Sequence, residues 1–571
     1  MERPRPTDDS EEQLKFRKQR AVRWLDPRVL VRTGAQSMMA EIFAAFADKR
    51  ELQGTLTQPV FSARTETEEE LWFDFVADLG DGFDATYSIA SLLAASELQP
   101  EGATRDLPRG RLLVMGGDQV YPAASTTAYE ERTKGVYRAA LPVAAPDGPR
   151  LFALPGNHDW YDGLTSFLRV FAQQRNFGGW STEQTRSYFA VALPRRWWLF
   201  AIDTQFDDYV DKPQLDYFRE VPLEPGDAVI LCTSKPSWLS AGSGGKTKGY
   251  DTIEFFQREI IRPRGATVPV MLTGDKHHFA HYQAEAGGRH LITCGLGGAY
   301  LSSTHRLPES LDLPPASSVV SPSAPQQTYT LREQYPAKKD SKRLARGVLR
   351  LPWRNPLFWL FTGVVQTVMS LAVLFGIGET VDPTRQGGFS LVGAWAPTAI
   401  LAVVLGLGGV AFARLDLPKA SGTNWVAGVL HAVPHLALST GWAFAVHWFH
   451  GALPTGEAAD WWTFGIFVAL TPTVIGFLDA EIVAAYLWFA SGFDINSNEL
   501  FAAQSIEDHK GFLRLHIDDR GTLWIYPIAL PEICRRWTAT PNGAPTDPWL
   551  VPTEPLAPEL IGTDPIEIPH P

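Results

Sequence analysis

The chain has 571 residues and a formal net charge of −12, so it can hold more than one domain and lacks the basic surface of a nucleic-acid-binding protein. Its three cysteines form neither a disulfide framework nor the paired spacing of a zinc site, which suits a reducing compartment. The N-terminal stretch MERPRPTDDSEEQLKFRKQR contains no apolar core, so we expect no secretory signal peptide.

Short apolar runs alternate with helix-like segments over the first half of the chain. After an extension over residues 1–70, six apolar runs bounded by polar turns predict buried strands. These runs are residues 73–78, 111–118, 150–159, 227–236, 268–278 and 289–298. Helical segments are predicted between them, at residues 83–96, 126–141 and 251–261. Because strands that alternate with helices are typical of layered α/β proteins, we place an α/β domain at 71–305 and expect the 1–70 extension to be helical.

The composition changes after residue 305. Residues 306–354 are predicted to be a linker, rich at first in Pro, Ser and Gln, that ends in a basic segment. Four stretches within 355–490 then lack acidic and basic side chains, and tryptophans lie at their edges. They are residues 355–378, 386–413, a run within 420–456, and 461–478. Since about 20 apolar residues in a helix cross the hydrocarbon core of a bilayer, we expect about four transmembrane helices and the lipid bilayer as a partner.

The charges of the flanking segments predict an orientation in the membrane. Residues 338–354 carry seven basic side chains and one acidic side chain, and the loop 414–419 is also basic. The loops 378–388 and 451–460 are acidic or poor in Lys and Arg. The positive-inside rule therefore predicts a multi-pass protein of the cell (inner) membrane whose α/β domain and C-terminus are cytoplasmic. The basic segment is expected to meet anionic lipid headgroups.

The last segment, residues 491–571, is polar again. Its runs GFLRLHI and TLWIYPI flank DDRG, which predicts a β-hairpin. We expect a small cytoplasmic tail that contains β-structure and packs on the α/β domain. Under this division, a fragment of residues 1–340 is expected to be active when assayed alone.

Four polar motifs follow predicted strands, where open α/β sheets collect ligands. They are VADLGDG with Asp78 and Asp81, MGGDQVYP with Asp118 and Tyr121, LPGNHDW with Asn157, His158 and Asp159, and LTGDKHH with Asp275, His277 and His278. Each motif alone is weak evidence, because an Asp at the end of a strand is common. Together, their oxygen and imidazole donors predict a site for two cations that share a bridging carboxylate.

The series DxG, GDxxY, GNHD and GxxH resembles the calcineurin-like metallophosphoesterase superfamily, and its first two motifs are most similar to the purple acid phosphatase variant. The resemblance covers roughly residues 70–305. It implies a four-layer α/β/β/α sandwich with a dinuclear metal centre between the sheets, to which the transmembrane bundle and the tail are additions. It also implies hydrolysis of phosphate mono- or diesters by attack of a metal-bound hydroxide.

The resemblance assigns roles to residues at matching positions. Asp78 and His277 match ligands of the first metal, Asp118 matches the bridging carboxylate, and Tyr121 matches the phenolate that binds ferric iron in the purple enzymes. Asn157 matches a ligand of the second metal.

In the GNHD motif, the resemblance also supplies a catalytic pair. His158 matches the residue that contacts the phosphoryl group and protonates the leaving oxygen. Asp159 would orient it.

Two departures from the pattern affect the second metal. Ser234 stands where the family usually has a histidine, and Asp275 replaces the first histidine of the last motif. Carboxylate and amide oxygens suit Mn and Mg better than imidazole does. We therefore expect two divalent or mixed-valence ions, with Fe or Mn at the first site and Mn or Mg at a weaker second site that gains Asp275.

Other polar residues receive less specific assignments. Asp81, Lys235 and His278 are candidates for the surroundings of the site or for substrate contact. For Asp84 and Asp203 we favour a place around the site or a helix-capping role. His281 is ranked low, as a surface residue within reach of substrate, and for His305 a structural role is favoured at least as strongly as a catalytic one. In the third apolar stretch, His431 and His435 lie on one helical face, and Asp479 and Glu481 follow the fourth stretch. Ionisable groups at membrane depth are candidates for a second site.

The sequence therefore predicts a membrane-anchored, metal-dependent phosphoesterase that acts at the cytoplasmic face on a lipid-linked or nucleotide substrate. The alternative is a catalytically degenerate member that serves as a membrane sensor or scaffold, because both missing histidines belong to the second metal. A transporter with a regulatory phosphoesterase domain is disfavoured, since the apolar stretches show no paired broken helices.

Overall fold

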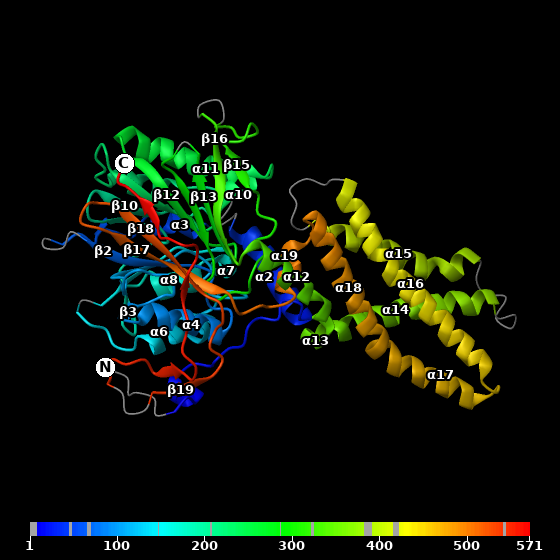
Figure 1. Ribbon diagram of the computed structural model, residues 1–571. Helices are drawn as coiled ribbons and strands as arrows, with labels where there is room; N and C mark the ends of the chain where they lie inside the picture. Colours follow the sequence, from blue (N-terminus) through cyan, green and yellow to red (C-terminus); the bar gives the residue numbers. More distant parts are fainter. Residues whose placement is uncertain are drawn as a thin grey trace. The chain divides into compact units, whose positions relative to one another are not determined.

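The computed structural model describes residues 8–44, 48–65, 70–146, 148–205, 208–285, 287–320, 325–381, 391–414, 422–540 and 544–571. The chain divides into two compact units (Figure 1). Unit 1 comprises Met1–Val22, Arg32–Ser341 and Ile506–Pro571, and unit 2 comprises Arg23–Val31 and Lys342–Ser505.

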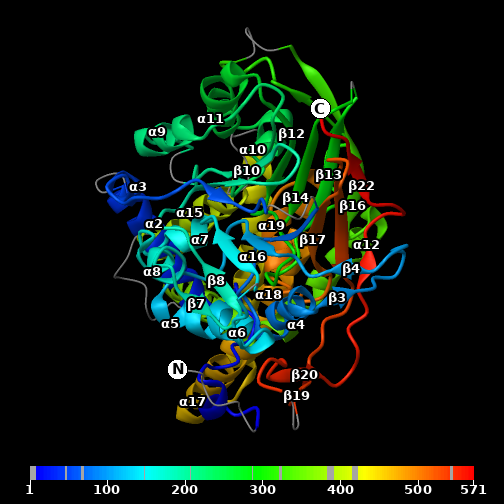
Figure 2. The ribbon, with the colours of Figure 1, turned by 90° about the vertical axis from the view of Figure 1, so that its left-hand side faces the viewer.

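Unit 1 contains two large sheets. Sheet I has nine strands within the described ranges. In spatial order they are β1 (Phe61–Ser62), β9 (Phe189–Ala192), β10 (Trp197–Ala201), β11 (Ala228–Cys232), β12 (Thr267–Thr273), β14 (His290–Cys294), β13 (Phe279–Ala284), β16 (Gln327–Tyr335) and β15 (Ser310–Leu313). Figure 2 shows β12, β14, β13 and β16 side by side.

Sheet II also has nine strands in the part of the chain that the structure describes. Their order is β21 (Glu559–Leu560), β18 (Leu523–Leu530), β17 (Lys510–Ile517), β2 (Leu71–Val76), β5 (Leu112–Met115), β6 (Arg150–Ala153), β8 (Trp180–Thr182) and β7 (Asn176–Phe177), and β22 (Ile566–Ile568) also pairs with β18. The central strands β2, β5 and β6 are parallel, as are β10, β11, β12 and β14 of sheet I. Continuous runs of Val, Leu, Ile and Phe form these strands because both faces of each sheet are covered.

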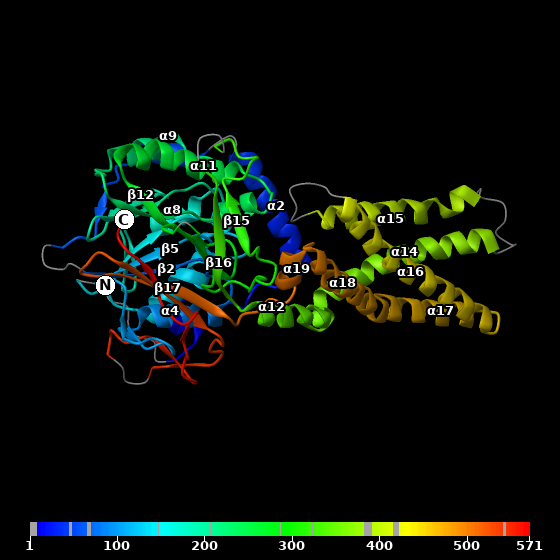
Figure 3. The ribbon, with the colours of Figure 1, turned by 45° about the horizontal axis from the view of Figure 1, so that its top comes forward.

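Helices and aromatic side chains cover the sheets. Sheet II shares a hydrophobic core with α4 (Phe83–Ala94), α6 (Gly135–Ala140) and α8 (Thr165–Phe171). Sheet I shares a second core with α9 (Lys212–Glu220) and α11 (Lys248–Phe256), which Figure 3 shows beside β12. Phe152 of β6 contacts Phe61 of β1 and Phe189 of β9, each with 5.0 Å between ring centroids. Unit 1 is therefore a mixed α/β fold in which side chains of the two sheets meet.

The C-terminal hairpin forms as predicted, but it does not belong to a separate tail. β17 pairs with β2 in antiparallel register, with Leu513 opposite Phe75, and it lies between β2 and β18. Arg514 and Asp74 form a buried ion pair across this junction, with nitrogen–oxygen distances of 2.8 and 3.2 Å. A fragment of residues 1–340 would lose both strands and expose the edge of β2, so it is not a self-contained domain. Alternating hydrophobicity predicts a hairpin but does not identify its partner strand.

The predicted linker also contains strands. β15 and β16 lie within 306–337, and β16 pairs with β13. Much of β16 is only partly buried, so its polar composition is that of a half-exposed strand. This explains why Pro, Ser and Gln suggested a loop there.

Unit 2 consists mainly of long apolar helices (Figures 1 and 3). They are α14 (Pro356–Val381), α15 (Leu391–Phe412), α16 (Gly422–Ala452), α17 (Glu457–Leu470) and α18 (Gly476–Ala490), with a π-turn at Thr471–Ile475 between the last two. Among the described residues, four helical segments are long and apolar enough to cross a membrane: Pro356–Thr380, Val392–Phe412, Gly422–Ala452 and Glu457–Phe493. These properties indicate a membrane protein.

The fourth helical segment is longer than predicted. It continues through Asp479 and Glu481 instead of ending before them. Asp479 can stay inside the helix because its carboxylate has hydrogen-bond donors on α14 and α16. Two of the loops that predicted the orientation are 378–388 and 414–419. Most residues of both loops lie outside the described residues.

Candidate metal centre

Three aspartates follow the ends of central strands in unit 1. Asp78 comes after β2, Asp118 after β5 and Asp275 after β12. All three have left-handed backbone conformations, with φ of 57°, 49° and 69°. Asp adopts this region more readily than most residues, yet each instance still costs free energy. Three such turns at strand ends indicate that the loops are shaped to aim these carboxylates.

Side chains from three of the predicted motifs converge on the hydroxyl of Tyr121. This oxygen lies 3.2 Å from Asp78 Oδ1, 3.3 Å from Asp118 Oδ2 and 3.0 Å from His277 Nε2. All four side chains are buried. The structure thus brings together the residues that the sequence analysis assigned to the first metal.

Two glycines allow the carboxylates to sit in this cluster. A Cβ atom at Gly156, in the GNHD motif, would lie 2.2 Å from Asp118 Oδ1. A Cβ atom at Gly295, just after β14, would lie 1.9 Å from Asp78 Oδ2. No side chain fits at either position without moving a carboxylate, so both glycines are part of the site.

The electrostatics of the cluster favour a bound cation. Burial, and then the charge of Asp275, raises the pKa of Asp78 well above its ordinary value, and exposed Lys276 offsets this only in part. Burial, and then Asp78, raises the pKa of Asp118 in the same way. Asp78 Oδ2 is buried and has no hydrogen-bond partner among the described residues. Buried carboxylates are normally paired or coordinated, so this unsatisfied oxygen fits a metal ligand.

The spacing of the groups is looser than in a formed metal site. Within the described ranges, no three His, Cys, Asp or Glu side chains are close enough together to hold an ion. The hydroxyl of Tyr121 instead stands between Asp78, Asp118 and His277. The donor types and the unsatisfied carboxylate oxygen fit a metal, and the side chains would have to move inward to bind it.

The GNHD motif forms the short helix α7 (Asn157–Trp160) beside the cluster. The backbone N–H of His158 donates to Asp118 Oδ1 at 2.8 Å, and its ring Nδ1 donates to the carbonyl of Pro122 at 2.7 Å. Burial lowers the pKa of His158 to about 4, so the ring is neutral near pH 7 and Nε2 is its acceptor nitrogen. The ring also contacts Tyr121 and Tyr161, with centroids 4.4 and 4.8 Å away.

Asp159 does not have the role that the resemblance assigned to it. Its carboxylate accepts hydrogen bonds from the hydroxyl of Tyr129 and from the backbone N–H groups of Gly156 and Gln119, the latter two at 2.8 and 3.3 Å. Burial raises the pKa of Asp159 to about 7. The carbonyl of Pro122 orients His158 instead, and Asp159 holds together the loops that follow β5 and β6. The pair that the resemblance implied does not form, because the side chains of His158 and Asp159 on α7 have different partners.

The residues predicted for the second metal lie on the more open side of the cluster. The side chain of Asp275 is 23% exposed, and its backbone N–H donates to Asp78 Oδ1 at 3.2 Å. Asn157 is partly exposed and donates to the hydroxyl of Tyr161 at 3.0 Å. Ser234 is buried, and its hydroxyl donates to Gln205 Oε1 at 2.8 Å.

Three further candidates are held by other interactions or lie apart from the cluster. Asp81 Oδ1 accepts from the backbone N–H of Val22 at 2.6 Å, so it anchors the N-terminal extension. Lys235 forms an ion pair with Asp208 at 2.5 Å. His278 is buried, and neither ring nitrogen has a hydrogen-bond partner among the described residues.

Sequence reasoning missed several residues of the site. Tyr300 stacks edge-on against His277, with 4.4 Å between ring centroids, and Tyr129 holds Asp159. Tyr300 follows the glycine-rich turn after β14, so its distance from β12 in the sequence concealed the contact. Lone tyrosines carry no motif signal that would have identified either residue.

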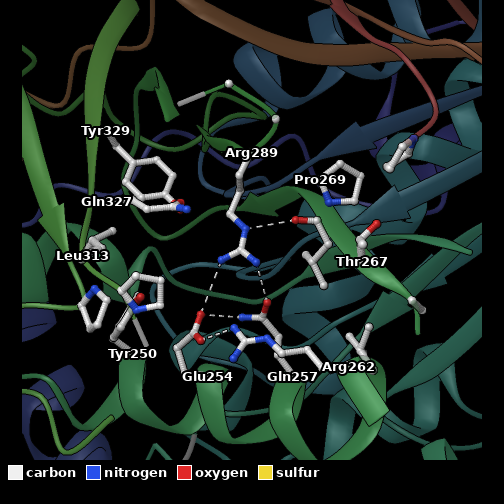
Figure 4. A pocket seen from close by; sticks show the side chains of 18 residues that line it. Tyr250, Glu254, Gln257, Arg262, Thr267, Pro269, Arg289, Leu313, Gln327 and Tyr329 are labelled. Atoms are coloured by element: carbon white, nitrogen blue, oxygen red, sulfur yellow. Dashed lines mark hydrogen bonds and ion pairs between the residues drawn. The ribbon is translucent and has the colours of Figure 1, made fainter. Parts of the chain in front are cut away.

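A separate cavity of about 540 Å³ lies between α11 and the strands β12 and β16 (Figure 4). Glu254 contacts Arg262 at 2.5 Å and Arg289 at 3.5 Å, and it accepts a hydrogen bond from Gln257 at 2.8 Å. Arg289 also donates to the carbonyl of Val268 at 3.1 Å. These groups satisfy one another, which is typical of a structural network that holds α11 on the sheet.

No protein-family model matches this chain, and no curated protein matches it. Among solved structures, PhoD is similar, with 12% sequence identity and a TM-score of 0.27. The similarity covers 43% of this chain and 60% of the PhoD chain, so the chain spans less than two thirds of PhoD. At this TM-score the similarity does not add to the argument from the site.

Proposed function

We propose that this protein is a membrane-anchored, metal-dependent phosphoesterase. The observation that carries the proposal is the convergence of Asp78, Asp118 and His277 on the hydroxyl of Tyr121, at distances of 3.0 to 3.3 Å. The layered α/β/β/α arrangement that the motifs imply is consistent with two sheets that each carry helices. The charges of the flanking segments support a cytoplasmic site in this proposal, and we propose the inner membrane as its location.

The residues divide between two ion positions. Asp78, Asp118, His277 and Tyr121 would hold a first ion, for which we favour Fe or Mn. Asn157 and Asp275, with Asp118 shared, would hold a second ion, and their oxygen donors favour Mn or Mg. Ions in such a pair would polarise the phosphate ester and lower the pKa of a water molecule.

In this proposal His158 contacts the phosphoryl group and protonates the leaving oxygen. It lies beside Asp118, it is half-buried at the open side of the cluster, and its neutral ring presents Nε2 as an acceptor. A histidine that starts neutral must take up a proton before it can protonate a leaving oxygen. The Pro122 carbonyl keeps the other ring nitrogen protonated and so fixes which nitrogen faces the substrate.

The substrate is proposed to be a phosphate mono- or diester, either lipid-linked or a nucleotide. The membrane helices favour a lipid-linked substrate, because they would keep the site close to the bilayer. The test is hydrolysis by the full-length protein, stripped of metal and resupplied with Mn, Mg, Fe or Zn. Aryl phosphate mono- and diesters serve as probes.

The matched controls for this test are two aspartate variants. Asp118→Asn should abolish metal-dependent turnover, whereas Asp216→Asn, at a partly exposed position on α9 that pairs with Lys212 and Arg219, should keep it. If no metal supports turnover of either ester by the wild-type protein, the phosphoesterase proposal is wrong.

One observation favours the second candidate, a non-catalytic sensor or scaffold. Ser234 is hydrogen-bonded to Gln205, and no ready-made three-ligand group exists in the described part of the chain. Such a protein would bind a phosphorylated ligand or a metal without turnover. Metal-stimulated binding of inorganic phosphate without hydrolysis of either ester would identify it.

A further inference from the structure

Helix α2 (Pro27–Ala44), in the N-terminal extension, exposes large apolar side chains. Leu30, Val31, Met38 and Met39 are 46, 74, 62 and 48% exposed. Val31 and Met38 are two helical turns apart and lie on the same face, with Leu30 and Met39 beside them. Apolar residues scattered singly over a protein surface need no explanation, but a group of them on one helix face indicates an interaction site.

The opposite face of α2 is polar and points into the protein. Thr33 and Ser37 are one turn apart on this face, Gln36 lies next to them, and all three are partly buried. The atoms Thr33 Oγ1 and Gln36 Oε1 are buried without a hydrogen-bond partner among the described residues. The hydroxyl of Tyr161 is hydrogen-bonded to Ser37 and also to Asn157, which lies on the open side of the metal centre.

The polarity of α2 is therefore the reverse of that expected for a helix in water. A helix on the surface of a soluble domain buries its apolar stripe and exposes its polar residues. In α2 the polar stripe faces the open side of the metal centre, and the apolar stripe faces away from the protein. The reversal is explained if the medium outside α2 is hydrocarbon.

Two further observations identify that medium as a lipid bilayer. Exposed Arg28 and Arg32 border the apolar face, and Arg28 keeps 79% of its side chain exposed although it forms an ion pair with Asp26 at 3.3 Å. Basic side chains beside an apolar face are typical of helices that lie in the membrane interface. The start of α2, up to Val31, also belongs to unit 2, which contains the helical segments of membrane-spanning length.

We propose that α2 lies in the interfacial layer of the bilayer, with Leu30, Val31, Met38 and Met39 among the acyl chains. Among the described residues, α2 is not one of the segments apolar enough to cross a membrane, so it lies in the plane of the surface. Its polar face, bonded to Tyr161, then keeps the open side of the metal centre close to the lipid headgroups. This inference does not depend on whether the site hydrolyses an ester.

The test measures the depth of α2 by fluorescence quenching. The three native cysteines are buried, so a fluorophore can be attached selectively to Met38→Cys in the full-length protein. The labelled protein is placed in phosphatidylcholine nanodiscs whose acyl chains carry bromine at a known depth. Bromine near the headgroup end should quench at least about twice as strongly as bromine near the terminal methyl, because interfacial helices reach only about 5–10 Å below the headgroups.

A matched control separates lipid contact from simple exposure. Val319 of unit 1 is 79% exposed, and a fluorophore at Val319→Cys should not be quenched by either lipid. Equal quenching at the two positions, no quenching at Met38→Cys, or stronger quenching there by the deeper bromine would overturn the proposal. Disulfide cross-linking between Met38→Cys of two chains, without quenching, would assign the face to a second copy of the protein and would also overturn it.

A charge placed on the apolar face tests the cause of the docking. Val31→Glu should reduce the quenching at Met38→Cys, because a carboxylate is costly to bury among acyl chains. The matched substitution Val319→Glu should leave that quenching unchanged. If both substitutions have the same effect, the apolar face of α2 does not hold the helix in the bilayer.

Discussion

The strand-end site of unit 1 and the bundle core of unit 2 both bury aspartates, but they treat the charge differently. Burial raises the pKa of both Asp78 and Asp118, with a further contribution from Asp275 at Asp78 and from Asp78 at Asp118, and Asp78 keeps an oxygen without a hydrogen-bond partner among the described residues. Asp479 is just as buried, but its Oδ1 receives donors from His435 and Gln366. The first arrangement fits an added cation, whereas the second is satisfied by its own side chains.

The backbone conformation around the aspartates also differs between the two regions. Asp78, Asp118 and Asp275 lie in loops with positive φ, whereas Asp479 lies in a regular helix. Strained loops at strand ends are costly and are retained where they position functional groups. Unit 1 also contains a buried aspartate that has a charged partner. This residue is Asp74, four residues before Asp78 in the sequence, and it forms an ion pair with Arg514. Four experiments test whether a paired and an unpaired buried carboxylate behave differently.

Removal of the arginine that pairs with Asp74 should have the largest effect of the four changes. Arg514→Leu leaves the carboxylate of Asp74 buried without its cation and should lower the free energy of unfolding of unit 1 by about 3–5 kcal/mol. Denaturant unfolding followed by tryptophan fluorescence measures this. Arg520→Leu, in the exposed β17–β18 turn, is the control and should have little effect. A loss no larger than that of the control would mean that the C-terminal strands do not stabilise sheet II.

Changes at the cluster of Asp78 and Asp118 should instead alter metal binding. His277→Phe should remove the metal that co-purifies with the protein and lower ester hydrolysis by at least about 100-fold, because loss of a ligand costs more than loss of its supporting hydrogen bond. His278→Phe is the matched control, since its ring does not bond to Tyr121, and it should keep the metal. Elemental analysis of both variants decides this, and equal metal contents would contradict the ligand assignment.

Asp81 tests burial without metal binding. Burial raises the pKa of Asp81 from 3.8 to about 6, so the folded chain binds more protons than the unfolded chain between these values. Stability from this group is therefore fully present below pH 3.8 and is lost as the pH rises through about 6. Asp81→Asn should match the wild type near about pH 4 and exceed it by about 2–3 kcal/mol near about pH 7.5. Denaturant midpoints at both pH values check this, and a difference that does not change with pH would refute it.

The bundle core should show the smallest effect. Asp479→Leu and His435→Leu should be coupled by about 1 kcal/mol in a double-mutant cycle, because interhelical hydrogen bonds in membranes are weak. The cycle is measured by unfolding the full-length protein in mixed micelles. Glu481→Leu paired with His435→Leu is the control, with no coupling expected. Equal coupling in both cycles would mean that Asp479 and His435 do not interact directly.

The motif residues could be found from the sequence because they follow continuous apolar runs. Asp78, Asp118 and His277 come directly after runs that form β2, β5 and β12, and parallel strands bring such ends to one edge. The partners of these residues were harder to find. Tyr300 and the Pro122 carbonyl act through contacts that no local pattern encodes, and the family resemblance paired Asp159 with His158, although the Pro122 carbonyl binds that ring instead.

The sequence by itself determined the local elements and the chemistry available to them: the apolar strands, the polar loops after them and the long helices without charges. These follow from side-chain properties within a few residues of each other, which is the range over which hydrophobic periodicity acts. Only the tertiary structure decided that β17 lies beside β2 and that Asp479 remains in its helix. Each of these depends on a partner more than 40 residues away in the sequence, where the free energy of packing, not local preference, selects the contact.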